Sequence, residues 1–240
     1  MISKFIYNSL IILSILLLII IIILVFINYI LGKEFFQNNY AEENEEYIEP
    51  EIIPNLINQE EINYIINKSE EKFDDSIVIA DKENAIQKDI RDSKTAWLSK
   101  NDNTIKSIIE KVCRITNKSI NNCEDLQVVK YDNNGYYKDH HDSCCDDSEL
   151  CENFKKNSGQ RVITCVIYLT DEFDGGETNF PNLNFKVKPS KGSAIIFHPM
   201  TNDEKKCHPK ALHAGMPVIS GTKIIANVWI REAPINSLVE

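Results

Sequence analysis

The chain has 240 residues, 36 of them acidic and 26 basic, and a formal net charge of −10 at pH 7. This length fits one domain of ordinary size with appendages. The acidic balance argues against a nucleic acid as the partner.

The N-terminal segment has the composition of a membrane anchor. From Leu10 to Ile27 the sequence is uncharged and, apart from one serine, apolar, and Lys4 and Lys33 bracket this run. About 20 apolar residues are what a helix needs to cross a bilayer. A buried core helix is the alternative, but the run is apolar all round and has no amphipathic stripe. We therefore expect residues 1–33 to be an uncleaved anchor of a single-pass, type II membrane protein with its domain in the endoplasmic reticulum or secretory lumen.

An acidic segment follows the expected anchor. Residues 34–52 contain six glutamates between Glu42 and Glu51 and little that a core would bury. Such a composition is typical of a solvated linker. The globular domain is therefore expected to begin near residue 53.

Seven cysteines are many for a cytosolic chain of this size, and a lumenal location would permit disulfides. Cys113 and Cys123 flank a short polar loop that a disulfide would close. A zinc site is the alternative use of four later cysteines, but none of their spacings is the C-x2-C of common structural sites. These four are Cys144, Cys145, Cys151 and Cys207. In a lumen, Asn67-Lys68-Ser69 and Asn117-Lys118-Ser119 would be glycosylation acceptors, as in a glycoprotein.

The globular part divides into a helical portion and a strand-rich portion. Apolar residues recur at helical spacing in residues 58–72 and 104–112, which predicts two helices packed on a sheet. From Leu126 onward, short β-branched or aromatic runs are separated by turn residues. These predicted strands are 126–131, 161–169, 185–188, 193–197 and 224–230. No long helical pattern lies between them, so we expect an α+β domain with an antiparallel sandwich or jelly roll.

One short motif indicates a metal site. His140 and Asp142 are two apart, and side chains at this spacing on a strand point to the same face. An open Fe(II) site for oxygen chemistry uses two histidines and one carboxylate on one face. A surface loop is the alternative, because the motif alone is weak in an Asp-rich chain. The second histidine must come from elsewhere.

His213, 71 residues past Asp142, is the candidate for that histidine. If Gly221 is a hairpin apex, simple pairing sets His213 opposite Trp229. The two-residue period of a strand then places Lys223, Ile225, Asn227 and Trp229 on that same face. A lysine facing inward beside such a cluster needs a buried anion.

The order of these residues resembles a known family. The motifs are His140-x-Asp142, His213, Lys223 ten residues later, Gly175-Gly176-Glu177-Thr178-x-Phe180-Pro181 and Leu126-Gln127-Val128-x-x-Tyr131. Together they are similar to the prolyl 4-hydroxylase branch of the 2-oxoglutarate and Fe(II) dependent dioxygenases. The resemblance extends from about Pro54 to Glu232. The high Ile, Asn and Lys content is typical of an AT-rich genome, such as that of a protist or a large DNA virus.

The resemblance implies a fold, a chemistry and a set of site residues. The fold would be a double-stranded β-helix, or jelly roll, over 123–233, with supporting helices in 53–122. Fe(II), 2-oxoglutarate, O2 and L-ascorbate would be its cofactors and co-substrates, with succinate and CO2 formed from 2-oxoglutarate. The implied iron ligands are His140, Asp142 and His213. Lys223 would bind the distal carboxylate of 2-oxoglutarate with Tyr131 and Thr178.

The resemblance also implies a peptidyl-proline 4-hydroxylase acting on proline-containing protein, collagen-like or proline-rich. Arg161, Trp229 and Tyr137 are the candidates for peptide contact, although Trp229 could equally belong to the core and Arg161 could cap a strand. His141 faces away from His140 and is not expected to be a ligand. The alternatives are a dioxygenase for lysine or a small molecule, and a non-catalytic jelly-roll binding module. The 143–160 insert remains without a role.

Overall fold

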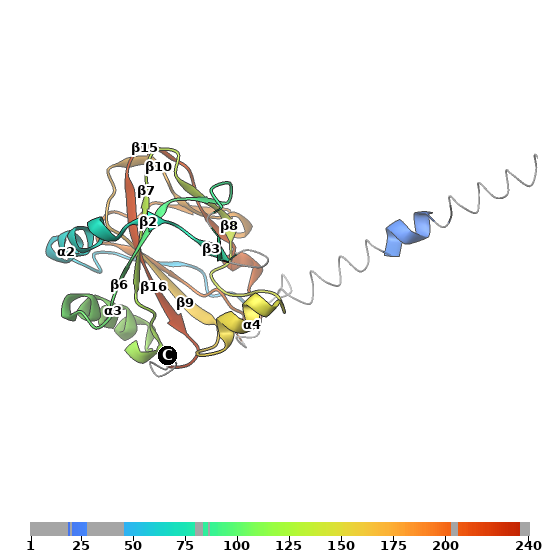
Figure 1. Cartoon of the computed structure of the whole chain (residues 1–240), viewed down its shortest axis with the longest axis horizontal. Coiled ribbons are helices and arrows are strands. Elements are labelled where there is room, and N and C mark those ends of the chain that lie inside the picture. Colours follow the sequence, from blue (N-terminus) through green and yellow to red (C-terminus); the bar gives the residue numbers. More distant parts are fainter. Residues whose placement is uncertain are drawn as a thin grey trace, which may run out of the picture.

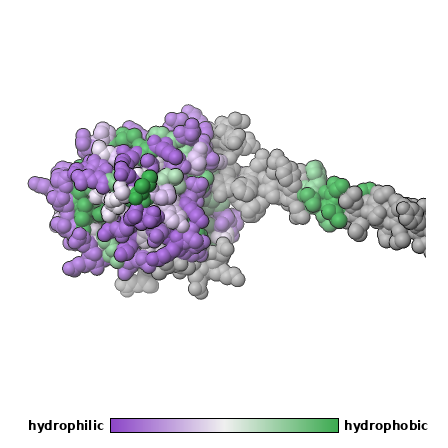
Figure 2. Space-filling model, turned by 90° about the horizontal axis from the view of Figure 1, so that it is seen from above, coloured by the Kyte–Doolittle hydropathy of each residue, from purple (hydrophilic) through white to green (hydrophobic). Residues whose placement is uncertain are grey.

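The computed structural model describes residues 19, 21–27, 46–79, 84–85, 87–202 and 206–235. The expected anchor lies outside the described residues, except for residue 19 and the helical residues 21–27. In Figure 2 this short piece is hydrophobic, whereas the visible face of the domain is mostly hydrophilic. None of the helices described here combines the length and the apolar character needed to cross a membrane. The first part of the expected linker, up to residue 45, also lies outside the described residues.

Both predicted helices are present. Helix α2 (Gln59–Ser69) begins at a capping box, in which the Glu61 amide donates to the Asn58 side chain and the Asn58 amide donates to Glu61, each at 2.9 Å. Helix α3 (Asn103–Thr116) begins at Asp102, whose carboxylate accepts two backbone N–H groups. A third helix, α4 (Glu149–Lys155), lies inside the insert that the sequence left unexplained.

In the described part of the chain, the strands form two large antiparallel sheets and two hairpin-sized ones. The seven-stranded sheet has the order β1 (Glu51–Ile53), β13 (Ala194–Phe197), β9 (Arg161–Tyr168), β16 (Lys223–Arg231), β7 (Leu126–Tyr131), β6 (Lys94–Leu98) and β2 (Asp74–Asp75). The five-stranded sheet has the order β12 (Phe185–Val187), β11 (Thr178–Phe180), β14 (His213–Gly215), β8 (Tyr136–His140) and β5 (Arg91–Asp92). The small sheets pair β10 (Phe173–Gly175) with β15 (Val218–Gly221) and β3 (Val78–Ile79) with β4 (Asn84–Ala85).

Two cores lie on the two faces of the seven-stranded sheet. One core packs α2 and α3 against the sheet, and it includes Ile65, Ile108 and Val128. The other core lies on the opposite face and includes Val129 and Phe180. In Figure 1 α2 and α3 lie on one side of this sheet, and β8 lies on the other. Neighbouring residues of β7 thus enter different cores, as the two-residue period of a strand requires. The expected α+β class with antiparallel sheets is confirmed.

The predicted pairing of His213 with Trp229 is wrong. β14 joins β8 and β11, whereas β16 runs between β7 and β9, with Trp229 opposite Thr164. Gly221 does take a positive φ of 80°, as a turn demands. The chain changes sheets between β14 and β15, where Pro217 removes a backbone donor.

The four later cysteines form two disulfides. Cys144 is bonded to Cys151 on α4, and Cys145 is bonded to Cys207, 62 residues further on. Their thiols are therefore not available to a zinc ion. Cys113 and Cys123 lie with their sulfur atoms 3.4 Å apart as free thiols, so the structure does not show the disulfide expected there.

Candidate active site

His140, Asp142 and His213 converge at one end of the five-stranded sheet. His140 ends β8, His213 begins β14, and the two residues are directly paired in this antiparallel ladder. Asp142 Oδ1 lies 3.8 Å from His140 Nε2, and its Oδ2 lies 3.8 Å from His213 Nε2. The three ligand atoms lie within 4.8 Å of one another. The structure thus brings together the three residues that the sequence singled out, although by another strand pairing than expected.

Backbone contacts fix the orientation of both imidazoles. His140 Nδ1 donates to the carbonyl of Lys138 at 2.7 Å, and His213 Nδ1 donates to the carbonyl of Ala211 at 3.1 Å. A carbonyl only accepts, so each Nδ1 carries the proton and each Nε2 keeps a free lone pair. Both lone pairs belong to the nitrogens nearest to Asp142. This is the tautomer that a metal ion requires.

The protonation states also suit a cation. Burial lowers the pKa of His140 well below its usual value, and the neighbouring His213 lowers it further. Burial raises the pKa of Asp142, but His213, His140 and Arg161 outweigh this effect and bring it to about 2. The site therefore presents a neutral imidazole and an ionised carboxylate at neutral pH, which is what metal binding needs.

A buried lysine lies deeper in the same cavity. Lys223, Tyr131 and Thr178 line this cavity together with the His–Asp–His cluster. Lys223 is 1% exposed, and its ammonium lies 5.3 Å from the ring centre of Tyr131. Burial lowers its pKa to about 7, with Glu177 opposing the shift. An anion bound here would relieve the cost of burying this charge.

Two of the three candidate peptide contacts, Tyr137 and Trp229, line the cavity, and Arg161 lies against Trp229. The ring of Tyr137 stacks on His140, with centroids 3.5 Å apart. The guanidinium of Arg161 lies 3.4 Å from the ring centre of Trp229. Arg161 donates from Nε and Nη2 to both oxygens of Glu124, at 2.7 and 2.8 Å, and from Nη1 to the carbonyl of Asp142. Arg161 is thus a fixed cation close to the His–Asp–His cluster.

Several residues of this cavity had no role predicted from the sequence. Arg91 is buried and lies over the ring of Tyr137, 4.7 Å from its centre. Asn227 donates to Gln127 at 3.0 Å across the paired strands β16 and β7, and both line the cavity. Arg91 precedes the motif-bearing region, so only folding brings it here. The alternation that placed Lys223 inward already pointed to Asn227.

Two further histidines are not part of the His–Asp–His cluster. His141 groups with Cys145 and Cys207. His208 is buried and accepts the backbone N–H of Lys210, which makes it a structural cap. That His141 is not an iron ligand stays a prediction.

Comparison with known proteins defines the class. Residues 126–231 match the family model of the 2OG-Fe(II) oxygenase superfamily, so fold and site together define an oxygenase of this superfamily. A protein of Acanthamoeba polyphaga mimivirus that bears the name of a prolyl 4-hydroxylase is 47% identical over 194 residues, which cover 81% of this chain and 78% of the relative. Prolyl 4-hydroxylase 1 of Arabidopsis thaliana is 30% identical over 198 residues, which cover 75% of this chain and 68% of that protein.

A solved structure gives the same answer. The viral collagen prolyl hydroxylase of Paramecium bursaria Chlorella virus-1, in complex with 2-oxoglutarate, has a TM-score of 0.57 and 31% identity, and the match covers 78% of this chain and 96% of that chain. The chain belongs to the prolyl 4-hydroxylase family of the 2-oxoglutarate and Fe(II) dependent dioxygenases. Its cofactors and co-substrates are Fe(II), 2-oxoglutarate and O2, and ascorbate is typical of the family. The donor set of two oriented imidazoles and one carboxylate fits Fe(II) with positions left open.

Proposed function

We propose that this enzyme hydroxylates carbon 4 of proline in peptide segments of proline-rich or collagen-like proteins. The observation that carries the proposal is the position of Arg161, whose fixed guanidinium stacks on Trp229 close to the His–Asp–His cluster. The relatives that cover most of the chain bear the name of prolyl 4-hydroxylases, and one solved neighbour is described as a collagen prolyl hydroxylase. A peptide in this position would present its proline to the metal site.

Each residue set has one task in this proposal. His140, Asp142 and His213 would hold Fe(II), and Thr164 would steady the carboxylate by its 2.7 Å hydrogen bond to Asp142. When bound, Fe(II) with 2-oxoglutarate and O2 supplies the oxidising power for an unactivated C–H bond. Lys223 would bind the distal carboxylate of 2-oxoglutarate as a desolvated ion pair. This ion pair orients the co-substrate before the peptide enters.

The hydroxyl groups around Lys223 complete the anion site. Tyr168 and Thr178 share a hydrogen bond of 2.5 Å, so Thr178 is held in place on the cavity wall. Tyr131, 4% exposed, belongs to the same wall and presents its hydroxyl beside Gly215. A carboxylate bound to Lys223 would thus have hydroxyl donors within reach. These are the groups that the resemblance assigned to 2-oxoglutarate.

Arg161 is equipped to bind a peptide carbonyl. A guanidinium has five N–H groups, and the contacts to Glu124 and Asp142 use three of them. Two N–H groups therefore remain for a ligand. Since Glu124 holds the guanidinium at two points, it is oriented before the peptide arrives, which lowers the entropy lost on binding. Trp229 is only 5% exposed, and its ring supports the guanidinium of Arg161 from 3.4 Å.

The test is succinate release by the full chain with a (Pro-Pro-Gly) repeat, a polyproline peptide or no peptide. We expect turnover that depends on peptide, the gain of one oxygen atom on proline, and loss of both in His140→Ala and Lys223→Ala. A lysine-containing peptide panel runs in parallel. Oxygen gained on lysine, or succinate formed without any peptide product, would overturn the proline assignment while leaving the oxygenase class intact.

We also propose a type II membrane protein with its domain in the endoplasmic reticulum or secretory lumen. The apolar run Leu10–Ile27 supports an anchor, and two disulfides suit an oxidising compartment. Asn67 and Asn117 are both exposed, as glycan acceptors must be. Expression in eukaryotic cells, carbonate extraction and glycosidase treatment test this. Release of the chain by carbonate would refute the anchor, and absence of any glycan shift would remove the support from Asn67 and Asn117.

A further inference from the structure

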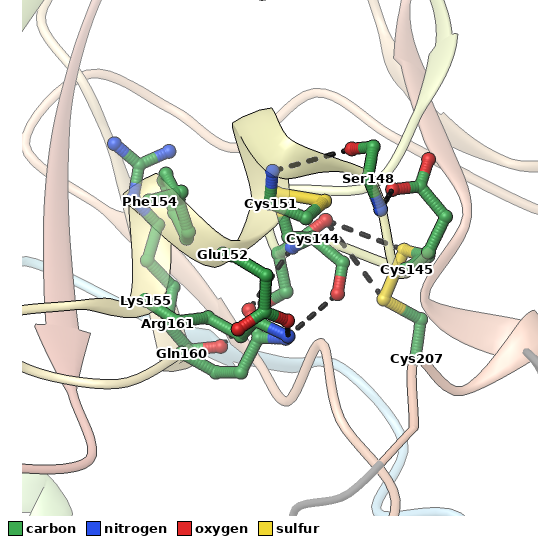
Figure 3. Close-up of a disulfide and its surroundings, with 12 residues drawn as sticks. Cys144, Cys145, Ser148, Cys151, Glu152, Phe154, Lys155, Gln160, Arg161 and Cys207 are labelled. Carbon is green, nitrogen blue, oxygen red and sulfur yellow. Dashed lines mark hydrogen bonds and ion pairs between the residues drawn. A yellow bond between two sulfur atoms is a disulfide. The ribbon is translucent and has the colours of Figure 1, made fainter.

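The 143–160 insert is a braced loop that starts right after Asp142. At its neck the amide of Cys144 donates to Gln160 Oε1 at 3.0 Å, and Gln160 Nε2 donates back to the carbonyl of Cys144 at 2.7 Å. Figure 3 shows Cys151 on α4 joined to Cys144, with the disulfide from Cys145 beside it. Two covalent bonds and a reciprocal amide pair therefore fix α4 relative to the cavity.

The far end of this insert touches a pair of arginines. The ring of Phe154, on α4, lies 3.9 Å from the guanidinium carbon of Arg231 and 5.2 Å from that of Arg161. Arg231 Nη1 donates to the carbonyl of Phe154 at 3.0 Å and to that of Gly159 at 2.8 Å. Arg231 is thus held by a ring face and by two carbonyls of the insert.

Glu124 connects the two arginines. Its Oε1 accepts from Arg231 Nε at 2.6 Å and from Arg161 Nε at 2.7 Å, and its Oε2 accepts from Arg161 Nη2. The carboxylate of Glu124 is therefore held by guanidiniums on both sides. The side chain of Arg161 is 14% exposed and that of Glu124 is 13% exposed, so solvent screens this network only partly.

We propose that Phe154 is a positioning residue for peptide binding. It holds Arg231 against Glu124, and Glu124 in turn fixes the plane in which Arg161 offers its two remaining N–H groups. The Cys144–Cys151 disulfide contributes by holding α4, and with it Phe154, over Arg231. The inference rests on the proposed function, because it concerns how that site holds its peptide. According to this proposal the insert, which carries no iron ligand, contributes to the affinity for peptide.

The test compares Phe154→Leu with Phe154→Tyr, which keeps the ring. Lys155→Ala, on the same helix, is the matched control, because Lys155 pairs only with Glu152 in the network described. We expect Phe154→Leu to raise the KM for peptide about tenfold, in line with the loss of a desolvated cation–π contact. The kcat and the KM for 2-oxoglutarate should stay within about twofold. Phe154→Tyr and Lys155→Ala should match the wild type.

The double variant Cys144→Ala with Cys151→Ala tests the brace. Like Phe154→Leu, it should raise the KM for peptide and leave the KM for 2-oxoglutarate nearly unchanged. An unchanged peptide KM in Phe154→Leu would overturn the proposal. So would equal losses in kcat and in both KM values, since these would show general damage to the fold.

A second measurement does not need a substrate. The chain has two tryptophans, so in a Trp97→Phe background Trp229 is the sole indole. If Phe154→Leu frees Arg161 from its stack on Trp229, acrylamide quenching of Trp229 should at least double, and Lys155→Ala should leave it unchanged. Wild type without peptide turnover would refute the proposed function, whereas unchanged quenching in Phe154→Leu would refute the positioning role.

Discussion

Binding of 2-oxoglutarate should take up a proton at Lys223. Burial lowers the pKa of this lysine to about 7 when no anion is present. At pH 8 only about a tenth of the molecules then carry the ammonium form. A bound carboxylate favours that charged form and raises the pKa of Lys223, so most molecules must gain a proton to bind. We expect about 0.9 proton per ligand at pH 8.

The same equilibrium sets the pH dependence of affinity. The apparent Kd is the intrinsic Kd divided by the fraction of protein in the competent form. That fraction falls from about a half at pH 7 to about a tenth at pH 8, so the affinity should fall about fivefold over this interval and about tenfold per unit above it. Affinity is therefore highest below pH 7 and is lost as the pH rises through the pKa of the free enzyme.

Calorimetry on enzyme loaded with Mn(II), in buffers of different ionisation enthalpy, measures both quantities. Lys223→Ala should bind 2-oxoglutarate at least about 30-fold more weakly, because it removes a desolvated charge pair, and should show no proton uptake at this position. An affinity that stays flat between pH 7 and pH 9 without proton uptake would refute the reasoning. It would mean that Lys223 is already charged before the co-substrate arrives.

Three further predictions concern other parts of the structure. Without ligand, Lys223→Met should raise the free energy of unfolding at pH 7 by something on the order of 2–4 kcal/mol. Wild-type stability should rise between pH 7 and 10, because the unfolded chain binds the extra proton there, and the substitution should abolish this rise. Urea unfolding across this pH range measures both effects. Thr164→Val removes the hydrogen bond to Asp142 and should weaken metal binding about 10- to 100-fold, as competition with a chelator will show; an unchanged affinity would refute the supporting role of Thr164. Loss of the Cys145–Cys207 disulfide, which joins residues 62 apart, should lower the free energy of unfolding by about 4 kcal/mol, and loss of the other disulfide, across seven residues, by about 2 kcal/mol. Chemical unfolding that shows the shorter loop to matter more would contradict this order.

The local sequence determined the elements and much of the site. The helical spacing of apolar residues in 58–72 and 104–112 predicted helices that the structure confirms. Alternation along 223–231 placed Lys223 and Asn227 on the cavity side, because a strand turns successive side chains to opposite faces whatever its partners are. The same two-residue period predicted that His140 and Asp142 lie on one face.

Tertiary structure alone decided which strands meet. His213 and Trp229 are separated by a turn, yet their strands belong to different sheets, because strand pairing depends on partners far along the chain and not on loop length alone. The sequence therefore grouped His213 with His140 and Asp142, as the structure does, but paired it with the wrong strand.

The surroundings of Arg161 depend on long-range contacts in the same way. Arg91 reaches the cavity from a strand far from any motif, and Phe154 reaches Arg231 only because two disulfides fold the insert back onto the sheet. No residue spacing encodes these contacts, since each joins side chains that are distant in sequence. The sequence thus determined which side chains carry the chemistry, and the packing of two sheets and a braced loop decided how they are held.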